Sequence, residues 1–183
     1  MSRRARILPR PPLTRRAIVA FPQAAPLDEV EAFRRRNDPL AVSLRAHITL
    51  VFPFASTLSA LQVATHVKRV AASWPVLPVR IEDVDAYDWK WVHLRVTRGR
   101  ASIGELHDRL YRRVLAPFLR REFDYAPHVT VGRADDVAIC ERMLREARAA
   151  FPRPLDAVLR SLSILALPPD GSLSVEAEIT LGN

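Results

Sequence analysis

The sequence predicts an α+β fold of two pseudo-symmetric lobes, each an antiparallel sheet with helices on its outer face, and a central cleft between the lobes. Three observations lead to this prediction. Segments with the two-residue alternation of strands are interleaved with segments of helical periodicity. The order strand, helix, strand, helix, strand occurs twice along the chain. No linker separates the two halves, so we expect a single domain over residues 15–183.

The first half is expected to contain three strands and two helices. A helix at 27–36 begins with acidic residues and ends with three arginines, an order that suits the helix dipole. A second helix, at 59–74, repeats apolar residues at helical spacing. The expected strands cover 16–21, 45–52 and 76–84.

The second half repeats this order. A helix at 102–119 is expected to carry an apolar stripe formed by Ile103, Leu106, Leu110 and Val114. Another helix is expected at 135–150. The expected strands cover 89–96, 128–131, 155–167 and 172–181. The last two would form a hairpin, because the sequence Pro-Pro-Asp-Gly at 168–171 is typical of a turn.

Two of the predicted strands carry the same pattern, a histidine and a threonine separated by one apolar residue. It reads AHITL around His47 and PHVTV around His128. Because side chains alternate along a strand, His47 and Thr49 should share one face, as should His128 and Thr130. The apolar residues of the two motifs are expected on the opposite face: Ile48, Leu50, Phe52, Val129 and Val131. Chance would produce two such strings about once in a thousand sequences of this composition.

This arrangement suits displacement at phosphorus. The attacking and the leaving oxygen lie on opposite sides of the phosphate, so one group must accept a proton where another donates one. Imidazole does either near neutral pH. Each threonine hydroxyl can donate a hydrogen bond to a non-bridging oxygen as negative charge develops there. We therefore interpret His47 and His128 as the catalytic pair and Thr49 and Thr130 as the phosphate-binding pair, with no metal required.

The segments AHITLVFPF and YAPHVTVGR resemble the duplicated His-x-Thr-x signature of the two-histidine phosphoesterase superfamily. Within it, the chain resembles the branch of 2′-5′ RNA ligases and RNA 2′,3′-cyclic phosphodiesterases. The segment WVHLRV and the later LHDRL are also similar to that branch, and the resemblance spans about 15–181. It implies the bilobal fold, no cofactor, and His47, Thr49, His128 and Thr130 as the site. Ala46 is a departure, since the second motif has Pro127 at this position.

Five further residues are candidates for substrate binding. On the strand at 89–96, Trp91, His93 and Arg95 should share a face, where Trp91 could stack on a base and Arg95 attract phosphate. An ordinary half-buried strand explains the pattern equally well. Tyr125 and Arg133 flank the second motif and could contact a nucleotide, although residues at strand ends are often simply solvated.

The remaining histidines and the one cysteine are interpreted structurally. His107 is expected at the edge of an apolar stripe, as a core-edge histidine with its hydrogen bonds satisfied. His66 is expected on a polar, solvated helix face. Cys140 belongs to an apolar helical stripe and should be a small core residue. No histidines pair at ligand spacing on a helix and no cysteines cluster, which disfavours a zinc site.

Composition sets broad limits. The formal net charge of +8 is compatible with an anionic partner, but nearly all of it is arginine, which a GC-rich coding bias would also produce. No apolar run approaches the roughly 20 residues of a membrane span. Residues 1–14 lack the pattern of a secretory signal and are expected to form a basic, flexible tail. A cytoplasmic monomer is the resulting expectation.

The sequence thus predicts a metal-independent phosphodiesterase that opens 2′,3′-cyclic phosphates on RNA or nucleotides, and that gives 2′-5′ ligation when an RNA 5′-hydroxyl replaces water. Three alternatives stay open. The chain could be an RNA- or nucleotide-binding module without turnover, or an esterase of the same superfamily for another cyclic phosphate. It could also be a structural protein with incidental histidines.

Overall fold

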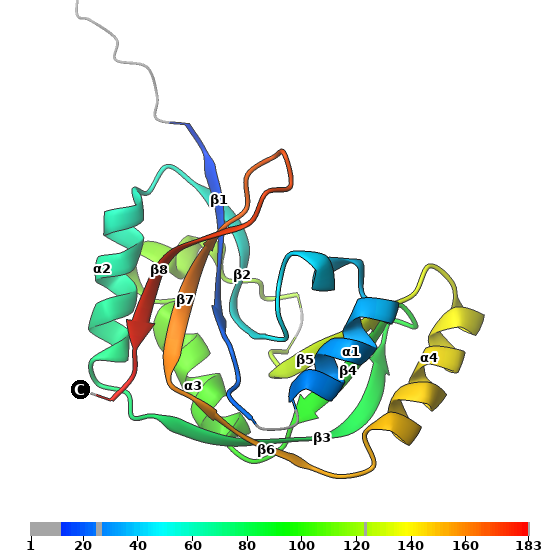
Figure 1. Cartoon of the computed structure of the whole chain (residues 1–183). Helices are drawn as coiled ribbons and strands as arrows, with labels where there is room; N and C mark the ends of the chain where they lie inside the picture. The colour runs from blue at the N-terminus through cyan, green and yellow to red at the C-terminus, as the bar shows by residue number, and fades with distance from the viewer. Residues whose placement is uncertain (1–11, 25–26, 123, 183) are drawn as a thin grey trace, which may run out of the picture.

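One antiparallel sheet of eight strands runs through the part of the chain that the computed structural model describes, residues 12–24, 27–122 and 124–182 (Figure 1). The strand order is β6-β3-β4-β5-β2-β1-β7-β8. The strands are β1 (Thr14–Ala20), β2 (Ile48–Ser56), β3 (Leu77–Tyr87), β4 (Trp91–Val96), β5 (His128–Arg133), β6 (Leu155–Leu159), β7 (Ser161–Ala166) and β8 (Ser174–Thr180).

Four α-helices in the described residues cover this sheet in two pairs: α1 (Leu27–Asn37), α2 (Ala60–Ala71), α3 (Arg100–Leu110) and α4 (Val137–Ala150). Helix α1 packs on β5, and α4 packs on β3, β4 and β5. Helix α3 packs on β2, and α2 packs on β7 and β8. Figure 1 accordingly shows α1 and α4 on one side of the molecule and α2 and α3 on the other. Two short 3-10 helices, η1 (Pro39–Val42) and η2 (Arg113–Phe118), complete the described elements.

The α+β prediction with two lobes is confirmed. One lobe contains β6-β3-β4-β5 with α1 and α4, and the other contains β2-β1-β7-β8 with α2 and α3. The lobes do not coincide with the two halves of the sequence. Strand β3 belongs to the first half but forms a hairpin with β4, while β7 and β8 belong to the second half but complete the sheet around β1. The chain therefore passes from one lobe to the other between α2 and β3, before the hairpin forms, and returns between β6 and β7.

Two elements were predicted with the wrong length. The helix expected at 102–119 ends at Leu110, and Val114 is 39% exposed instead of lying on the apolar stripe. Pro117 rules out one α-helix through the whole predicted segment, because its ring would clash with the carbonyl of Arg113. Arg113 instead has a φ of 53°. The strand expected at 155–167 is two strands, because β6 pairs with β3 and β7 pairs with β1 in the other lobe. The other predicted elements are confirmed, and each of their ends lies within four residues of its predicted position.

The burial of His107, His66 and Cys140 tests the structural interpretation of these residues. His107 is buried and its Nδ1 donates to the carbonyl of Leu50 at 2.8 Å, as predicted for a satisfied core-edge histidine. Cys140 is buried, also as predicted. The prediction that His66 is solvated is wrong: it is buried and its Nε2 lies 2.8 Å from the carbonyl oxygen of Leu110. Helix α3 packs against α2 and covers this position, a contact between distant segments that helical periodicity cannot reveal.

The predicted tail at 1–14 lies outside the described residues except for 12–14, of which Thr14 begins β1. No helix in the described ranges has both the length and the apolar character to cross a membrane.

Candidate active site

The two motifs meet where the lobes join. Ile48 of β2 pairs with Val129 of β5, and both side chains are buried. Leu50 and Val131 are buried on the same side. Side chains alternate across a strand, so the histidine and threonine of each motif face the opposite side of the sheet.

Val51 departs from the predicted alternation. The register of β1 against β2 shifts at this point, with Ile18 opposite Val51 and Val19 opposite Thr49. As a result Val51 is buried directly after Leu50. Phe52 is half-buried and keeps the predicted facing, since its ring lies against His107 of α3, the helix that packs on β2. A local irregularity of this kind is not anticipated by a strict period of two.

The register brings each histidine to the threonine of the other motif. Extending the antiparallel pairing by one residue in each direction places His47 opposite Thr130, and Thr49 opposite His128. Side chains opposite each other on one face have Cβ atoms about 4.5–5.5 Å apart, and diagonal neighbours about 7–8 Å. The two imidazoles therefore occupy one diagonal of a four-residue cluster and the two hydroxyls occupy the other.

A cavity of about 300 Å³, the site cavity, opens on this face. His47 and Thr130 both line it, although they come from different motifs, which agrees with the register. The remaining lining residues come from η1 and from the paired ends of β4 and β5: Asp38, Pro39, Leu40, Trp91 and Arg133.

Both motif histidines are held in the same way. The Nδ1 atom of His47 lies 2.7 Å from the carbonyl oxygen of Arg45, and that of His128 lies 2.7 Å from the carbonyl oxygen of Ala126. A carbonyl oxygen only accepts hydrogen bonds, so Nδ1 carries the proton in each ring. The neutral form of each imidazole therefore has its lone pair on Nε2, which can accept a proton or, once protonated, donate one.

Burial governs the protonation of these rings. It lowers the pKa of His47 to about 4; the carbonyl of Arg45 opposes the shift, whereas the Arg34 guanidinium reinforces it. Burial also lowers the pKa of His128, while the carbonyl of Ala126 and the carboxylate of Asp85 oppose the change. Both imidazoles are therefore neutral at pH 7 while the site holds no anion. A phosphate anion between them would favour their charged forms.

His93 lies directly beside the second motif. Its ring stacks on that of His128, with centroids 3.8 Å apart and an angle of 15° between the planes. The ring of Tyr87 also stacks on the ring of His93, with the two centroids 6.2 Å apart. Sequence reasoning missed Tyr87. The signal was its place just before the β3–β4 turn, where it pairs with Trp91.

Trp91, Arg133 and Arg95 lie on the same part of the sheet. Trp91 pairs with Arg133, whose guanidinium carbon is 5.2 Å from the centroid of the Trp91 indole, and both line the site cavity. Arg95 pairs with His128 across β4 and β5, and its Nε lies 3.8 Å from a carboxylate oxygen of Asp85. The structure thus brings these three predicted residues together around the motif histidines.

Tyr125 lies behind the first motif. Its hydroxyl donates to the carbonyl of Thr49 at 2.8 Å, and its ring stacks on His107 at 3.7 Å between centroids. Burial raises the pKa of this hydroxyl, so it stays a donor. Tyr125 therefore ties the segment before β5 to the backbone of β2. Its predicted contact with a nucleotide stays a prediction.

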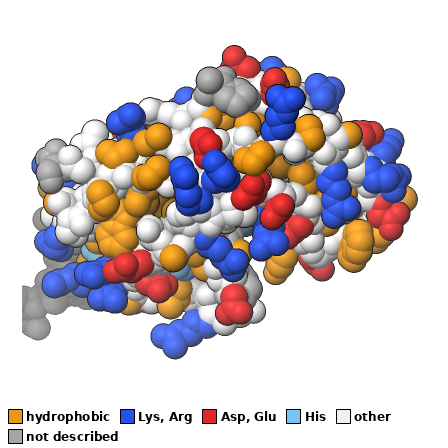
Figure 2. Space-filling view, turned by 90° about the horizontal axis from the view of Figure 1, so that it is seen from below, with side chains coloured by type: hydrophobic (Ala, Val, Ile, Leu, Met, Phe, Trp, Pro, Cys, Tyr) orange, Lys and Arg blue, Asp and Glu red, His pale blue; other side chains and the backbone are white. Residues whose placement is uncertain are grey.

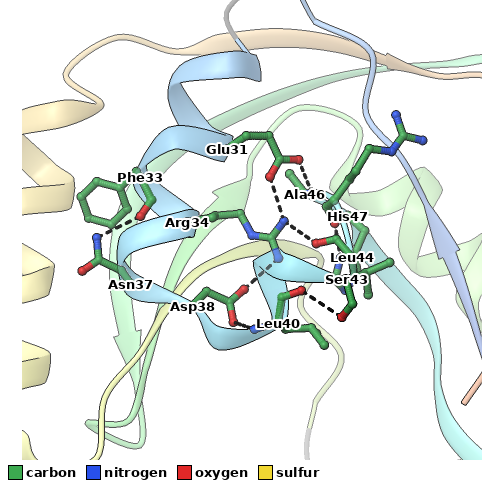
Figure 3. A network of polar contacts seen from close by, with 11 residues as sticks. Glu31, Phe33, Arg34, Asn37, Asp38, Leu40, Ser43, Leu44, Ala46 and His47 are labelled. Carbon is green, nitrogen blue, oxygen red and sulfur yellow. Dashed lines mark hydrogen bonds and ion pairs between the residues drawn. The ribbon is translucent and has the colours of Figure 1, made fainter. Parts of the chain in front are cut away.

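A buried ion network, which sequence reasoning missed, holds the segment that leads into His47 (Figure 3). The guanidinium of Arg34 is fully buried and donates to Asp38 at 2.8 Å, to Glu31 at 3.2 Å and to the carbonyl of Leu44 at 2.9 Å. The other carboxylate oxygen of Glu31 accepts from the backbone N–H of Ala46. Helix α1 thereby fixes the backbone on both sides of Arg45. The spacing of Glu31, Arg34 and Asp38, three and four residues apart, was the available signal.

The burial of His93 predicts acid sensitivity. Its pKa is about 3 in the folded protein, lowered by burial and by His128, and about 6.5 in the unfolded chain. Below pH 6.5 the unfolded chain binds a proton that the folded protein does not, so stability falls as the pH falls. Phenylalanine can still stack but does not titrate. In His93→Phe, the free energy of unfolding should therefore fall by up to about 1.4 kcal/mol less per pH unit than in the unmodified protein.

Urea unfolding at pH 7.5 and pH 5 measures this effect. The loss of stability between the two values should be about 2 kcal/mol smaller in His93→Phe than in the unmodified protein. Equal losses would show that His93 is not the group that titrates.

The described residues contain no group of three or more histidine, cysteine, aspartate or glutamate side chains placed to hold a metal ion.

Comparison with known families and proteins places the chain among phosphoesterases. Residues 21–167 match the family model of the 2′-5′ RNA ligase superfamily. A protein of Geobacillus thermodenitrificans named as a phosphoesterase is 29% identical over 119 residues, which cover 63% of this chain and 67% of that protein. A protein of Halalkalibacterium halodurans with a similar name is 27% identical over 119 residues, 63% and 68% of the two chains.

Solved structures show the same fold. The crystal structure of E. coli LigT complexed with 3′-AMP aligns with a TM-score of 0.66 at 14% identity, covering 93% of this chain and 99% of that one. The structure of E. coli LigT complexed with NADP+ aligns with a TM-score of 0.61 at 15% identity, covering the same shares.

Proposed function

Because the chain belongs to the 2′-5′ RNA ligase superfamily of phosphoesterases, we propose that it hydrolyses 2′,3′-cyclic phosphates at the ends of RNA or of nucleotides. His47 and His128 act as acid and base, and no metal takes part in the reaction.

One observation carries the proposal: both imidazoles bind a backbone carbonyl through Nδ1, and each faces the threonine of the other motif. One Nε2 accepts a proton from water as its oxygen bonds to phosphorus. The other Nε2 donates a proton to the ribose oxygen that leaves, so the ring of the cyclic phosphate opens to a monophosphate. Thr49 and Thr130 donate to the non-bridging oxygens.

The site cavity suits a nucleotide in size and composition. Its volume of about 300 Å³ is at the lower end for small-molecule sites. Trp91 lines the cavity together with Arg133, whose guanidinium lies over the indole ring and carries positive charge. Arg95 adds positive charge beside His128, and His93 supports the ring of His128. The complexes of E. coli LigT with 3′-AMP and NADP+ support a nucleotide as the ligand class.

Overall charge adds little to this proposal. On the face seen in Figure 2, lysine and arginine side chains are interspersed with aspartate and glutamate instead of forming one continuous basic surface. The described part of this face therefore offers no continuous basic surface to a phosphate backbone.

The test is incubation with an RNA that ends in a 2′,3′-cyclic phosphate, with EDTA present, and separation of the 2′- from the 3′-monophosphate product. We expect one of the two monophosphates to form in the presence of EDTA. Addition of an RNA with a 5′-hydroxyl should also yield some 2′-5′ linked product, because the hydroxyl can replace water as the attacking group, the ribose 3′-oxygen then leaves, and the same two imidazoles accept and donate the protons. Tight binding without any product would favour a binding module, and turnover of other cyclic phosphates alone would favour a different esterase of this superfamily.

A further inference from the structure

The β3–β4 hairpin ends in a turn that holds a tryptophan in a backbone conformation suited to glycine. The N–H of Lys90 donates to the carbonyl of Tyr87 at 3.1 Å, and the two central residues, Asp88 and Trp89, have φ values of 53° and 47°. Two positive φ angles are the mark of a type I′ turn, for which Asn-Gly is strongly preferred. A β-carbon in this conformation comes too close to the following carbonyl oxygen. The backbone therefore disfavours tryptophan at position 89.

The core does not require Trp89 either. Its side chain is 52% exposed, and that of Tyr87 on the same turn is 53% exposed. Two large aromatic side chains at a strained, exposed turn stabilise the fold little. A strained residue that persists under such conditions points to a functional contact.

Stacked aromatic rings connect this turn to the motif histidine His128. The ring of His128 stacks on His93, and the ring of Tyr87 stacks on His93 in turn. Tyr87 is also the strand partner of Trp91, which lines the site cavity. A row of aromatic rings thus leads from the phosphate position to the hairpin end.

Positive charge accompanies these rings. The ammonium group of Lys90 lies 6.0 Å from the centroid of the Trp91 ring, and the guanidinium of Arg133 lies on the same indole. Asp88 adds a negative charge at the tip of the turn. Phosphates would therefore approach the Lys90 side, and uncharged base faces would approach the aromatic rings.

We propose that the hairpin platform, Tyr87, Trp89 and Lys90, binds the nucleotide on the 5′ side of the cyclic terminus, which makes an RNA strand the preferred substrate over a mononucleotide. This inference rests on the proposed function and names its substrate class. Stacking on an aromatic side chain accepts any base, so the preference is for a strand and not for a sequence.

The test compares two substrates that share the same terminal nucleotide, a 2′,3′-cyclic mononucleotide and a short RNA with a 2′,3′-cyclic end. The unmodified protein should have the higher kcat/KM for the RNA. Trp89→Gly should lower the ratio of the two kcat/KM values by about 10-fold or more, the range that one base–aromatic stack provides. Trp89→Phe should retain most of the preference. Leu61→Ala, which removes an exposed apolar side chain from the other lobe, should leave the ratio unchanged.

Stability provides a second readout that separates binding from structure. Glycine adopts positive φ without strain, so Trp89→Gly should unfold at the same temperature as the unmodified protein or at a higher one. An unchanged substrate ratio in Trp89→Gly would overturn the proposal, and so would a clear loss of stability, because Trp89 would then be structural.

If the unmodified protein hydrolyses neither substrate, the proposed function fails. Fluorescence titration with an RNA ending in a 3′-monophosphate then still measures how tightly the hairpin platform binds RNA. Weaker binding by Trp89→Gly than by Leu61→Ala would support the platform, and equal binding would refute it.

Discussion

Replacing either His47 or His128 with alanine is expected to lower kcat for opening a cyclic phosphate by about 10²–10⁴-fold. Each variant removes one of the two Nε2 atoms that the reaction needs, one to accept a proton and one to donate it. The measurement is steady-state hydrolysis of a 2′,3′-cyclic nucleotide, with thermal unfolding to verify that each variant is folded. The double variant should be hardly slower than either single variant, because the two groups act as a unit. Turnover close to that of the unmodified protein in either variant would refute the assignment.

The pH dependence provides a separate check on the same pair. One imidazole must be neutral and the other protonated, so kcat/KM should follow a bell-shaped curve set by the free protein. The pKa of His47 is about 4 and that of His128 is lowered from 6.5, both mainly by burial. The maximum should therefore lie below pH 6.5, with a fall of about tenfold per pH unit on its alkaline side. A flat curve from pH 5 to 9 would contradict this mechanism.

Arg34→Met is expected to lower the free energy of unfolding by about 3–5 kcal/mol. The guanidinium is fully buried, and its removal leaves the carboxylates of Asp38 and Glu31 without their cation and the carbonyl of Leu44 without a donor. Urea denaturation at pH 7.5 measures the change. Because the network also holds the backbone around Arg45, kcat should fall together with stability.

Arg35→Met is the matched control, since this neighbouring arginine is exposed on the same helix, and its effect should stay within about 0.5 kcal/mol. Adding Asp38→Asn to Arg34→Met should recover part of the loss, because it removes one unpaired charge while its amide oxygen can still accept from the N–H of Leu40. A loss in Arg34→Met no larger than that in Arg35→Met would show that the network does not stabilise the fold.

Local patterns predicted most of the fold. The acidic start and basic end of α1, the helical spacing in α2 and the alternation around both motifs depend on neighbours a few residues apart, so they are visible in the sequence. One of the two predictions of wrong length had a local cause that was overlooked, because Pro117 cannot lie inside a continuous α-helix. The other did not, since only the pairing of β6 with β3 and of β7 with β1 divides the predicted strand at Arg160.

By itself, the sequence determined the α+β class and the shared facing of His47 with Thr49 and of His128 with Thr130, because a short alternating pattern decides which side chains lie on one face of a strand. Only the tertiary structure decided which lobe each strand joins, that His66 is buried, and that His93 and Tyr87 stack beyond His128. It also decided that α1 supplies the ion network beside His47. The physical reason is that burial, stacking and ion pairing depend on segments far apart in the chain, whose pairing no local period encodes.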